Sequence, residues 1–221
     1  MPKKNAFIFD LKAAERHLAT RDERLAELID STAPFSIDPR RSPYEALLES
    51  IAYQSISGKA AATIFGRVKA LGRNGAAPTP ETMLKLRTPV LRKAGLSGAK
   101  VAAMKDLAKK TLAGVVPTLT QAHKMSDEEL IERLVSVRGI GVWSVEMFLI
   151  VRLGRPDVLP VHDLGVKKGW AVTYGKSRMP TPKELLAFGE RWRPYRTVAT
   201  WYMWRAFERA GYAVTNKIQA R

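Results

Sequence analysis

One carboxylate in the second half of the chain has a sequence context that suits catalysis. Asp163 follows Pro160, which stops the preceding apolar run, and it precedes the segment "LGVKKGW". An aspartate in this position can simply cap the N-terminus of a helix. A carboxylate in a cleft can also stabilise a developing oxocarbenium cation or orient the water that attacks it. Asp163 is therefore a candidate catalytic residue, with helix capping as the alternative.

Two glycines upstream of Asp163 suit a different task. In "LVSVRGIGVWSVEMF" the apolar periodicity of one helix breaks at residues 138–141 and then resumes. Glycine can adopt positive φ and lets another backbone come close, so Gly139 and Gly141 can form a tight hairpin between two helices. The amides at the start of the second helix then bind an anion, such as a DNA phosphate. The alternative is an ordinary glycine C-cap.

Aromatic side chains provide a third kind of candidate, because they stack on bases and attract cations to their faces. Each of them alone is equally compatible with core packing. Trp143 is the strongest candidate for a functional role, because it lies next to the glycine hairpin in the sequence. The candidates are Tyr53, Trp143, Trp170, Trp192, Tyr195, Trp201, Tyr202 and Trp204.

The charge of the chain indicates a polyanionic partner. The formal net charge is +16 and the sequence pI is about 10.2. Residues 150–221 contain 14 Lys and Arg against 5 Asp and Glu, so this third of the chain carries +9 of the excess. Nucleic acid is the commonest partner of so basic a domain, and a merely basic protein is the alternative.

Several function classes are excluded by what the 221 residues lack. There is no cysteine, which removes disulfides, thiolate chemistry, zinc–cysteine sites and iron–sulfur clusters and fits a reducing compartment. The first residues, "MPKKNAFIFDLKAAERHL", contain no apolar core of the length a signal peptide needs. No apolar stretch approaches the length of a membrane span, so no membrane partner is expected.

The hydrophobic spacing predicts an all-α fold. Ser42 is expected to cap one helix, with Pro43 at its first position, and Ser126 with Glu129 is expected to form a capping box. The one strand-like alternation, "AFIF" at residues 6–9, is too short to form a sheet. Helices are predicted over 10–32, 44–56, 59–71, from 79, 88–112 (two, divided at 95–97), 127–137, 142–153, 163–175, 181–192 and 196–211.

Four segments, in this order along the chain, resemble one protein family. They are "LLESIAYQSISGKAA", "LRKAGLSGAKVAAMKDLA", "LVSVRGIGVWSVEMFLIVRLGRPDVLPVHDLG" and "ERWRPYRTVATWYMW". Together they resemble the helix-hairpin-helix, Gly/Pro-loop and Asp motif of base-excision DNA glycosylases, in particular the 3-methyladenine DNA glycosylase II (alkylation-repair) branch. The resemblance covers about residues 42–208, and the combination is much more specific than any single motif.

The resemblance implies a single helix-hairpin-helix glycosylase domain over residues 1–221, with two helical lobes and the active site in the cleft between them. The central lobe would span about 43–150, with the hairpin at 126–152, and the terminal lobe would combine 1–42 with 151–221. With 42 residues before this region, a short form without the N-terminal β-domain of longer relatives is expected. The absence of cysteine also excludes the iron–sulfur loop of the endonuclease III branch.

The resemblance also assigns roles. Asp163 would be the catalytic carboxylate, and no catalytic cofactor is implied. The base pocket would contain Trp143, Met147, Trp204 and Tyr53. DNA contacts would come from Gln54, Ser55, Ile56, Arg138, Gly139, Ile140, Gly141, Val142 and Trp143. A structural Na or K ion would bind the backbone carbonyls of Val135, Val137 and Ile140.

This chain departs from the family pattern at three of these positions. The usual Gln-Gln pair is Gln54-Ser55, so the side chain that fills the gap in the DNA is smaller. Met147 replaces a tyrosine of one branch, which weakens aromatic stacking on the lesion. Trp143 stands where bifunctional members have the lysine that forms a Schiff base, so no lyase step is expected.

The expected function is a monofunctional glycosylase that flips alkylated purines out of duplex DNA in base excision repair and hydrolyses the N-glycosidic bond. The expected substrate is 3-methyladenine, with 7-methylguanine as a second candidate, and His162 is a weak candidate for acid assistance. One alternative is a glycosylase for uracil or for a deaminated or mispaired base. Another is a non-catalytic helix-hairpin-helix DNA-binding protein. A monomer is expected, cytoplasmic and nucleoid-associated in a bacterium or nuclear in a eukaryote.

Overall fold

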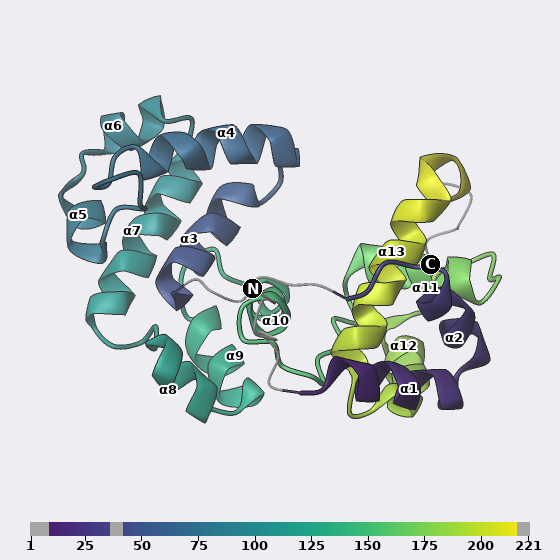
Figure 1. Ribbon diagram of the computed structural model, residues 1–221. Coiled ribbons are helices and arrows are strands. Elements are labelled where there is room, and N and C mark those ends of the chain that lie inside the picture. Colours follow the sequence, from purple (N-terminus) through teal and green to yellow (C-terminus); the bar gives the residue numbers. More distant parts are fainter. Residues whose placement is uncertain (1–8, 36–41, 216–221) are drawn as a thin grey trace. The chain divides into compact units, whose positions relative to one another are not determined.

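The computed structural model describes residues 9–35 and 42–215, with side chains up to residue 211 (Figure 1). These residues form thirteen α-helices and one short 3-10 helix, and they contain no strand. The all-α prediction is therefore confirmed. The segment "AFIF" lies outside the described residues except for Phe9. None of the helices in the described ranges is long and apolar enough to cross a membrane.

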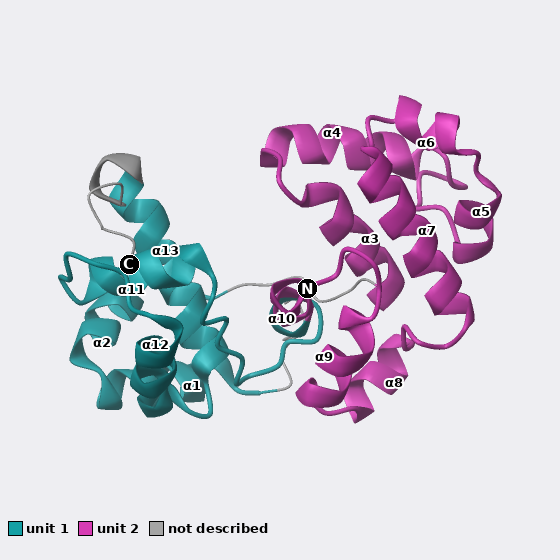
Figure 2. Ribbon diagram, turned by 180° about the vertical axis from the view of Figure 1, so that it is seen from behind, with its two compact units in different colours: residues 1–39, 149–221 teal, residues 40–148 magenta. Residues whose placement is uncertain are grey.

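The chain divides into two compact units, shown in different colours in Figure 2. Unit 1 combines residues 1–39 with 149–221, and unit 2 is the continuous segment 40–148. The segments before and after unit 2 in the sequence therefore belong to the same unit. Each unit has its own buried apolar core.

Unit 2 is built around α7 (Gly98–Leu112), whose buried face packs on α3, α5 and α6 (Figure 1). Its other helices are α3 (Pro43–Tyr53), α4 (Gly58–Lys69), α5 (Pro80–Lys85), α6 (Thr88–Lys93), α8 (Leu119–Lys124), α9 (Asp127–Val135) and most of α10 (Val142–Val151).

Side-chain caps fix where most helices of unit 2 begin. The Ser42 hydroxyl accepts the N–H of Glu45 at 3.2 Å, and Ser126 and Glu129 form the reciprocal pair, so both predicted caps are confirmed. Helix α8 was not predicted, although its start carries the same signal: Thr118 and Gln121 form a capping box. The segment is too short for its apolar spacing to show a helical period.

Unit 1 consists of α1 (Leu11–Arg21), α2 (Glu23–Asp30), α11 (Leu164–Thr173), α12 (Pro182–Gly189), the 3-10 helix η1 (Glu190–Trp192) and α13 (Arg196–Thr215). The helical segment predicted over 10–32 consists of two helices, because the chain breaks at Asp22. That buried carboxylate accepts the N–H of Leu25, the hydroxyl of Tyr174 at 2.6 Å and the indole N–H of Trp192 at 3.0 Å. A local cap and two tertiary partners of one side chain thus override the helical periodicity of the segment.

Helices α11 and α13 of unit 1 pack together and come very close at a glycine. A Cβ atom on Gly169 of α11 would lie 1.8 Å from the carbonyl oxygen of Met203 on α13. Only glycine fits where two helix backbones come this close. The packing of α11 on α13 sets the position of Asp163, which precedes α11, relative to Trp204 on α13.

Candidate active site and DNA-binding hairpin

Asp163 is the N-cap of α11 and is only 9% exposed. Its Oδ1 atom accepts the backbone N–H of Val166 at 2.8 Å and the indole N–H of Trp204 at 2.9 Å. The capping alternative is thus correct, and it coexists with a second donor from a different helix. Together the two N–H groups fix the orientation of the carboxylate.

A glycine that the sequence reasoning did not single out makes this arrangement possible. A Cβ atom on Gly165 would lie 3.0 Å from Cδ1 of Trp204 and 3.2 Å from Oδ1 of Asp163. Gly165 therefore leaves room for the indole beside the carboxylate. The signal in the sequence is the glycine of "DLG", directly after Asp163 and Leu164.

Both sequence neighbours of Asp163 are exposed, although Asp163 itself is buried. Leu164 is 54% exposed, an unusual position for a large apolar side chain in a well-packed unit. His162 is exposed as well. An apolar side chain and a polar one thus lie at the surface on either side of a buried carboxylate.

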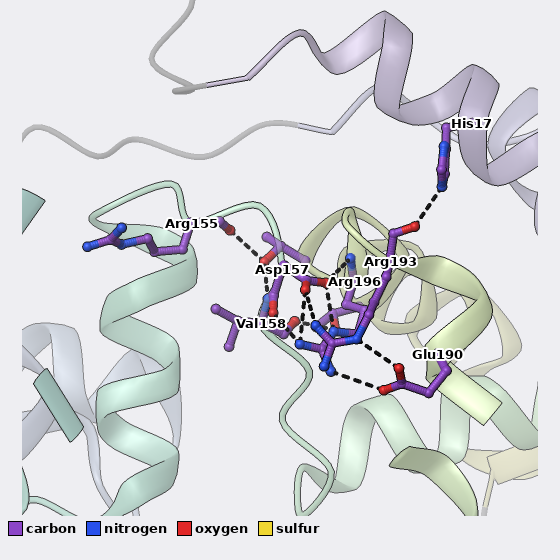
Figure 3. Close-up of polar contacts among 9 residues, drawn as sticks. His17, Arg155, Asp157, Val158, Glu190, Arg193 and Arg196 are labelled. Carbon is purple, nitrogen blue, oxygen red and sulfur yellow. Dashed lines mark hydrogen bonds and ion pairs between the residues drawn. The ribbon is translucent and has the colours of Figure 1, made fainter. Parts of the chain in front are cut away.

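The segment that leads into Asp163 is attached to the first turn of α13 (Figure 3). The carboxylate of Asp157 accepts bonds from Arg193 Nη1 at 2.6 Å and from Arg196 Nε at 2.7 Å. Thr197 Oγ1 donates to the carbonyl of Arg155 at 2.6 Å and accepts the N–H of Val158 at 3.0 Å. Residues 155–158 of the loop before Asp163 are therefore bonded to residues 193–197, where the helix that carries Trp204 begins.

The same network extends to the other helices of unit 1. Arg193 Nε donates to Glu190 at 2.9 Å, and this bond is the main cause that raises the pKa of the Arg193 guanidinium. The carbonyl of Arg193 lies 2.7 Å from Nε2 of His17 on α1 (Figure 3). These contacts join α1 and η1 to the start of α13.

The glycine hairpin lies in unit 2, between α9 and α10. The N–H of Ile140 donates to the carbonyl of Val137 at 3.0 Å, which closes the turn. Gly139 has φ +79°, and its missing Cβ would lie 3.1 Å from Cβ of Ala103 on α7, so a side chain is disfavoured twice. The first amides of α10 follow Gly141, where a helix leaves its N–H groups without intrahelical acceptors.

The connection between α3 and α4 is bonded to this hairpin. Gln54 Nε2 donates to the carbonyl of Gly139 at 2.8 Å and lies 3.4 Å from Ser144 Oγ. Ser55 has the positive φ of +59° and is exposed, and Ile56 is 40% exposed. The predicted DNA-contact segments at 54–56 and 138–143 are thus brought together within unit 2.

Helix α7 also supports this connection. Lys100 Nζ donates to the carbonyl of Ala52 at 2.8 Å, at the end of α3. Burial lowers the pKa of the Lys100 ammonium. The last turn of α3 is therefore held by a charged donor from the helix on which it packs.

The model of the HhH-GPD superfamily of base excision DNA repair proteins matches residues 48–194. The chain belongs to this superfamily. It is 38% identical over 213 residues to DNA-3-methyladenine glycosylase 1 of Schizosaccharomyces pombe, covering 95% of this chain and 93% of that protein.

Solved structures agree with the sequence comparison. The 3-methyladenine DNA glycosylase of S. pombe in complex with abasic DNA gives a TM-score of 0.81 at 37% identity, covering 87% of this chain and 95% of that one. The DNA-3-methyladenine glycosidase of Bacillus halodurans gives 0.80 at 32% identity, covering 92% and 94%. The family resemblance and the fold predicted from it are thus confirmed.

In this HhH-GPD protein the aromatic candidates separate by burial. Trp192, Trp201 and Tyr202 are buried in the core of unit 1, so for them the packing alternative is correct. Trp170 and Tyr195 pack against the same core, as does Trp204, which in addition reaches Asp163. Trp143, by contrast, is 45% exposed at the start of α10.

The predicted pocket residues belong to both units of the HhH-GPD protein. Trp204 lies in unit 1, whereas Tyr53, Trp143 and Met147 lie in unit 2. Tyr53 is exposed and Met147 is half-buried on α10. Within unit 1, Trp204 contacts Asp163. Within unit 2, the connection at residues 54–56 contacts the hairpin.

The predicted Na or K ion stays a prediction. One of the three expected carbonyls, that of Val137, already accepts the N–H of Ile140. The next carbonyl upstream, that of Ser136, accepts a bond from the Lys110 ammonium. Among the described residues, no group of three or more His, Cys, Asp or Glu side chains could hold a metal ion.

Proposed function

We infer that this HhH-GPD protein is a monofunctional DNA glycosylase that removes alkylated purines from duplex DNA in base excision repair. The observation that supports this inference best is that the Asp163 carboxylate is buried and accepts hydrogen bonds from the N–H of Val166 and the indole of Trp204. The motif around it resembles the one that contains the family's catalytic carboxylate, which supports this role for Asp163. The names of the relatives support 3-methyladenine as the substrate.

The chemistry follows from the charge of the lesion. A purine alkylated at N3 or N7 carries a formal positive charge, so its departure with the electrons of the N-glycosidic bond leaves a neutral base. The sugar left behind has oxocarbenium character, which the Asp163 carboxylate stabilises. Water then forms the new bond at C1′ and releases a proton, and the products are free base and an abasic site. Little acid catalysis is needed, so His162 is not required.

Substrate selection depends on the same charge. The electron-rich face of an indole attracts a cationic base, and Trp204 lies beside the carboxylate. Trp143 and Tyr53, both exposed in unit 2, are the further candidates for stacking on the flipped base. We propose 3-methyladenine as the first substrate and 7-methylguanine as a second.

The hairpin would bind the DNA backbone without recognising bases. The amides of residues 141–143 open α10 and offer donors to a phosphate. The net charge of +16 adds salt-dependent affinity for any sequence, as a search for damage requires. Trp143 replaces the Schiff-base lysine of bifunctional members, so the abasic product would not be cleaved by that route.

The deciding experiment compares wild type with Asp163→Asn on DNA treated with a methylating agent, with the released bases separated by chromatography. Asparagine keeps an oxygen that accepts from Val166 and Trp204, so the local fold is preserved. We expect wild type to release 3-methyladenine, and the variant to be slower by about a hundredfold or more while it still binds an abasic-site analogue.

Two other outcomes would redirect the assignment. Wild type that releases uracil but no methylated base would make the protein a glycosylase for another lesion. Wild type that binds DNA and releases no base would make it a DNA-binding protein. We also propose that the protein acts as a monomer, which size-exclusion chromatography with light scattering tests; a stable dimer would contradict it.

A further inference from the structure

One face of α7 lies along the glycine hairpin. Ala103, Asp106 and Lys110 are spaced three and four residues apart, so they share one side of the helix. Ala103 contacts the hairpin at Gly139, where a Cβ would lie 3.1 Å away. Further along this face, Asp106 and Lys110 make the polar contacts.

These two side chains bond opposite kinds of backbone group in the turn. Asp106 Oδ2 accepts the backbone N–H of Arg138 at 2.7 Å. The Lys110 ammonium donates to the carbonyl of Ser136. Lys110 Nζ also lies 3.3 Å from Asp106 Oδ2, so the two opposite charges offset each other while both side chains hold the backbone that leads from α9 into the turn.

The local energetics favour a charged pair here. Each side chain is 27% exposed, so solvent screens the pair only in part. Burial acts to raise the pKa of the Asp106 carboxyl, but the bonds from the Arg138 amide and from Lys110 outweigh it and lower the pKa overall. Asp106 therefore stays ionised at neutral pH, and its bond to the amide is a charge-assisted one.

A carboxylate at this place is unexpected on electrostatic grounds. The next residue after Arg138 is Gly139, and the amides proposed to bind phosphate follow within a few residues. A negative charge near a phosphate site repels DNA and weakens binding. Lys110 offsets this charge within the pair, but removal of Asp106 alone would add one positive charge beside the hairpin, which by itself favours DNA binding.

We propose that Asp106, together with Lys110, is a positioning residue for DNA binding: the pair holds residues 136–138 so that the amides of residues 141–143 keep the geometry that binds a phosphate. The proposal rests on the proposed function, because it assumes that the hairpin binds the DNA backbone. It assigns a task to α7 that the resemblance to the family does not.

The test uses the sign of the effect. Asp106→Ala raises the net charge by one, so electrostatics alone predicts tighter DNA binding, whereas loss of positioning predicts weaker binding. We expect the Kd for duplex DNA with an abasic-site analogue to rise by about tenfold, the size of one hydrogen bond to a charged group. The single-turnover rate of base release at saturating enzyme should change by less than about twofold, because Asp163 lies in the other unit.

Two matched variants separate positioning from charge and from folding. Glu132→Ala removes an exposed carboxylate of α9 and should bind DNA as tightly as wild type or slightly more tightly. Asp106→Asn keeps an acceptor oxygen and should recover most of the lost affinity. Thermal unfolding of each variant shows that a weaker Kd is not a loss of folded protein.

The lysine gives an independent arm in case Asp106→Ala does not fold. Lys110→Met should weaken binding and Lys110→Arg should restore it, while Lys109→Met, which removes an exposed charge from the same helix, should have a smaller effect than Lys110→Met. Asp106→Ala that binds as tightly as Glu132→Ala, or Lys109→Met that matches Lys110→Met, would overturn the proposal. Wild type that neither excises nor binds would instead refute the proposed function.

Discussion

The indole Nε1–H of Trp204 donates to Oδ1 of Asp163 at 2.9 Å, across the contact between α13 and α11. The same oxygen caps α11 through the N–H of Val166. One carboxylate is thus oriented by two helices at once. In the proposed reaction Trp204 has two roles, because it would face the alkylated base and it holds the catalytic carboxylate in place.

The indole bond should matter for rate more than for binding. Trp204→Phe keeps an aromatic ring but removes the donor to Asp163, so we expect single-turnover base release to fall by about tenfold with little change in the Kd for abasic-site DNA. Trp170→Phe is the matched control, because the Trp170 indole N–H is buried without a hydrogen-bond partner in the described structure. Equal loss of rate in both variants would show that the Asp163 bond has no special role.

Gly165 should be sensitive to the smallest possible side chain. Gly165→Ala places a Cβ 3.0 Å from Trp204 and 3.2 Å from Asp163, which displaces the indole or the carboxylate by a few tenths of an ångström. We expect base release to slow by about tenfold, since small misplacements of catalytic groups are costly. Gly66→Ala, where a Cβ meets nothing within 4 Å, is the control and should leave the rate unchanged. An unchanged rate in Gly165→Ala would mean that the site adapts without loss.

Gly169 should be sensitive through stability. In Gly169→Ala the new Cβ would lie 1.8 Å from the Met203 carbonyl oxygen, so α11 and α13 must move apart. We expect a loss of about 3 kcal/mol in the free energy of unfolding, measured by urea denaturation. The Gly66→Ala control should instead gain up to about 1 kcal/mol, because alanine is the better helix former. A Gly169→Ala protein as stable as wild type would contradict the close helix contact.

Alkaline pH should reveal the buried hydroxyl of Tyr44. Burial, with a smaller contribution from Glu81, raises the Tyr44 pKa, and the hydroxyl donates to the carbonyl of Pro78 at 3.1 Å. A raised pKa means that the neutral phenol stabilises the folded state below the unfolded pKa of about 10, and that this contribution is lost as the pH rises further.

The measurement compares the urea unfolding of wild type and Tyr44→Phe between pH 7 and 11. At pH 7 the variant should be less stable by about 1 kcal/mol, because it lacks the bond to Pro78. Above pH 10 the difference in unfolding free energy should shrink. Only wild type is destabilised there, because the Tyr44 phenol ionises in the unfolded chain and stays neutral in the folded one. A difference that stays constant up to pH 11 would show that Tyr44 ionises normally.

Local signals in the sequence were sufficient to predict most helix starts. Ser42 and the Ser126–Glu129 pair cap their helices as predicted, because a cap is decided by residues three positions apart. The break at Asp22 has such a local signal too, because its Oδ1 accepts the N–H of Leu25 three positions on, but the apolar spacing continues across it. The other oxygen of this carboxylate bonds Tyr174 and Trp192, residues more than 150 positions away, and no local pattern indicates these partners.

The sequence by itself determined the all-α class, the family and the candidate residues, since periodicity, caps and the order of motifs are properties of neighbouring residues. Only the tertiary structure decided which candidates meet. It placed Trp204 on Asp163, Gln54 on the hairpin carbonyl of Gly139, and Asp106 on the hairpin amide of Arg138. These pairs lie 41, 85 and 32 positions apart. Contacts over such separations depend on how helices pack, and no pattern within one helix encodes them.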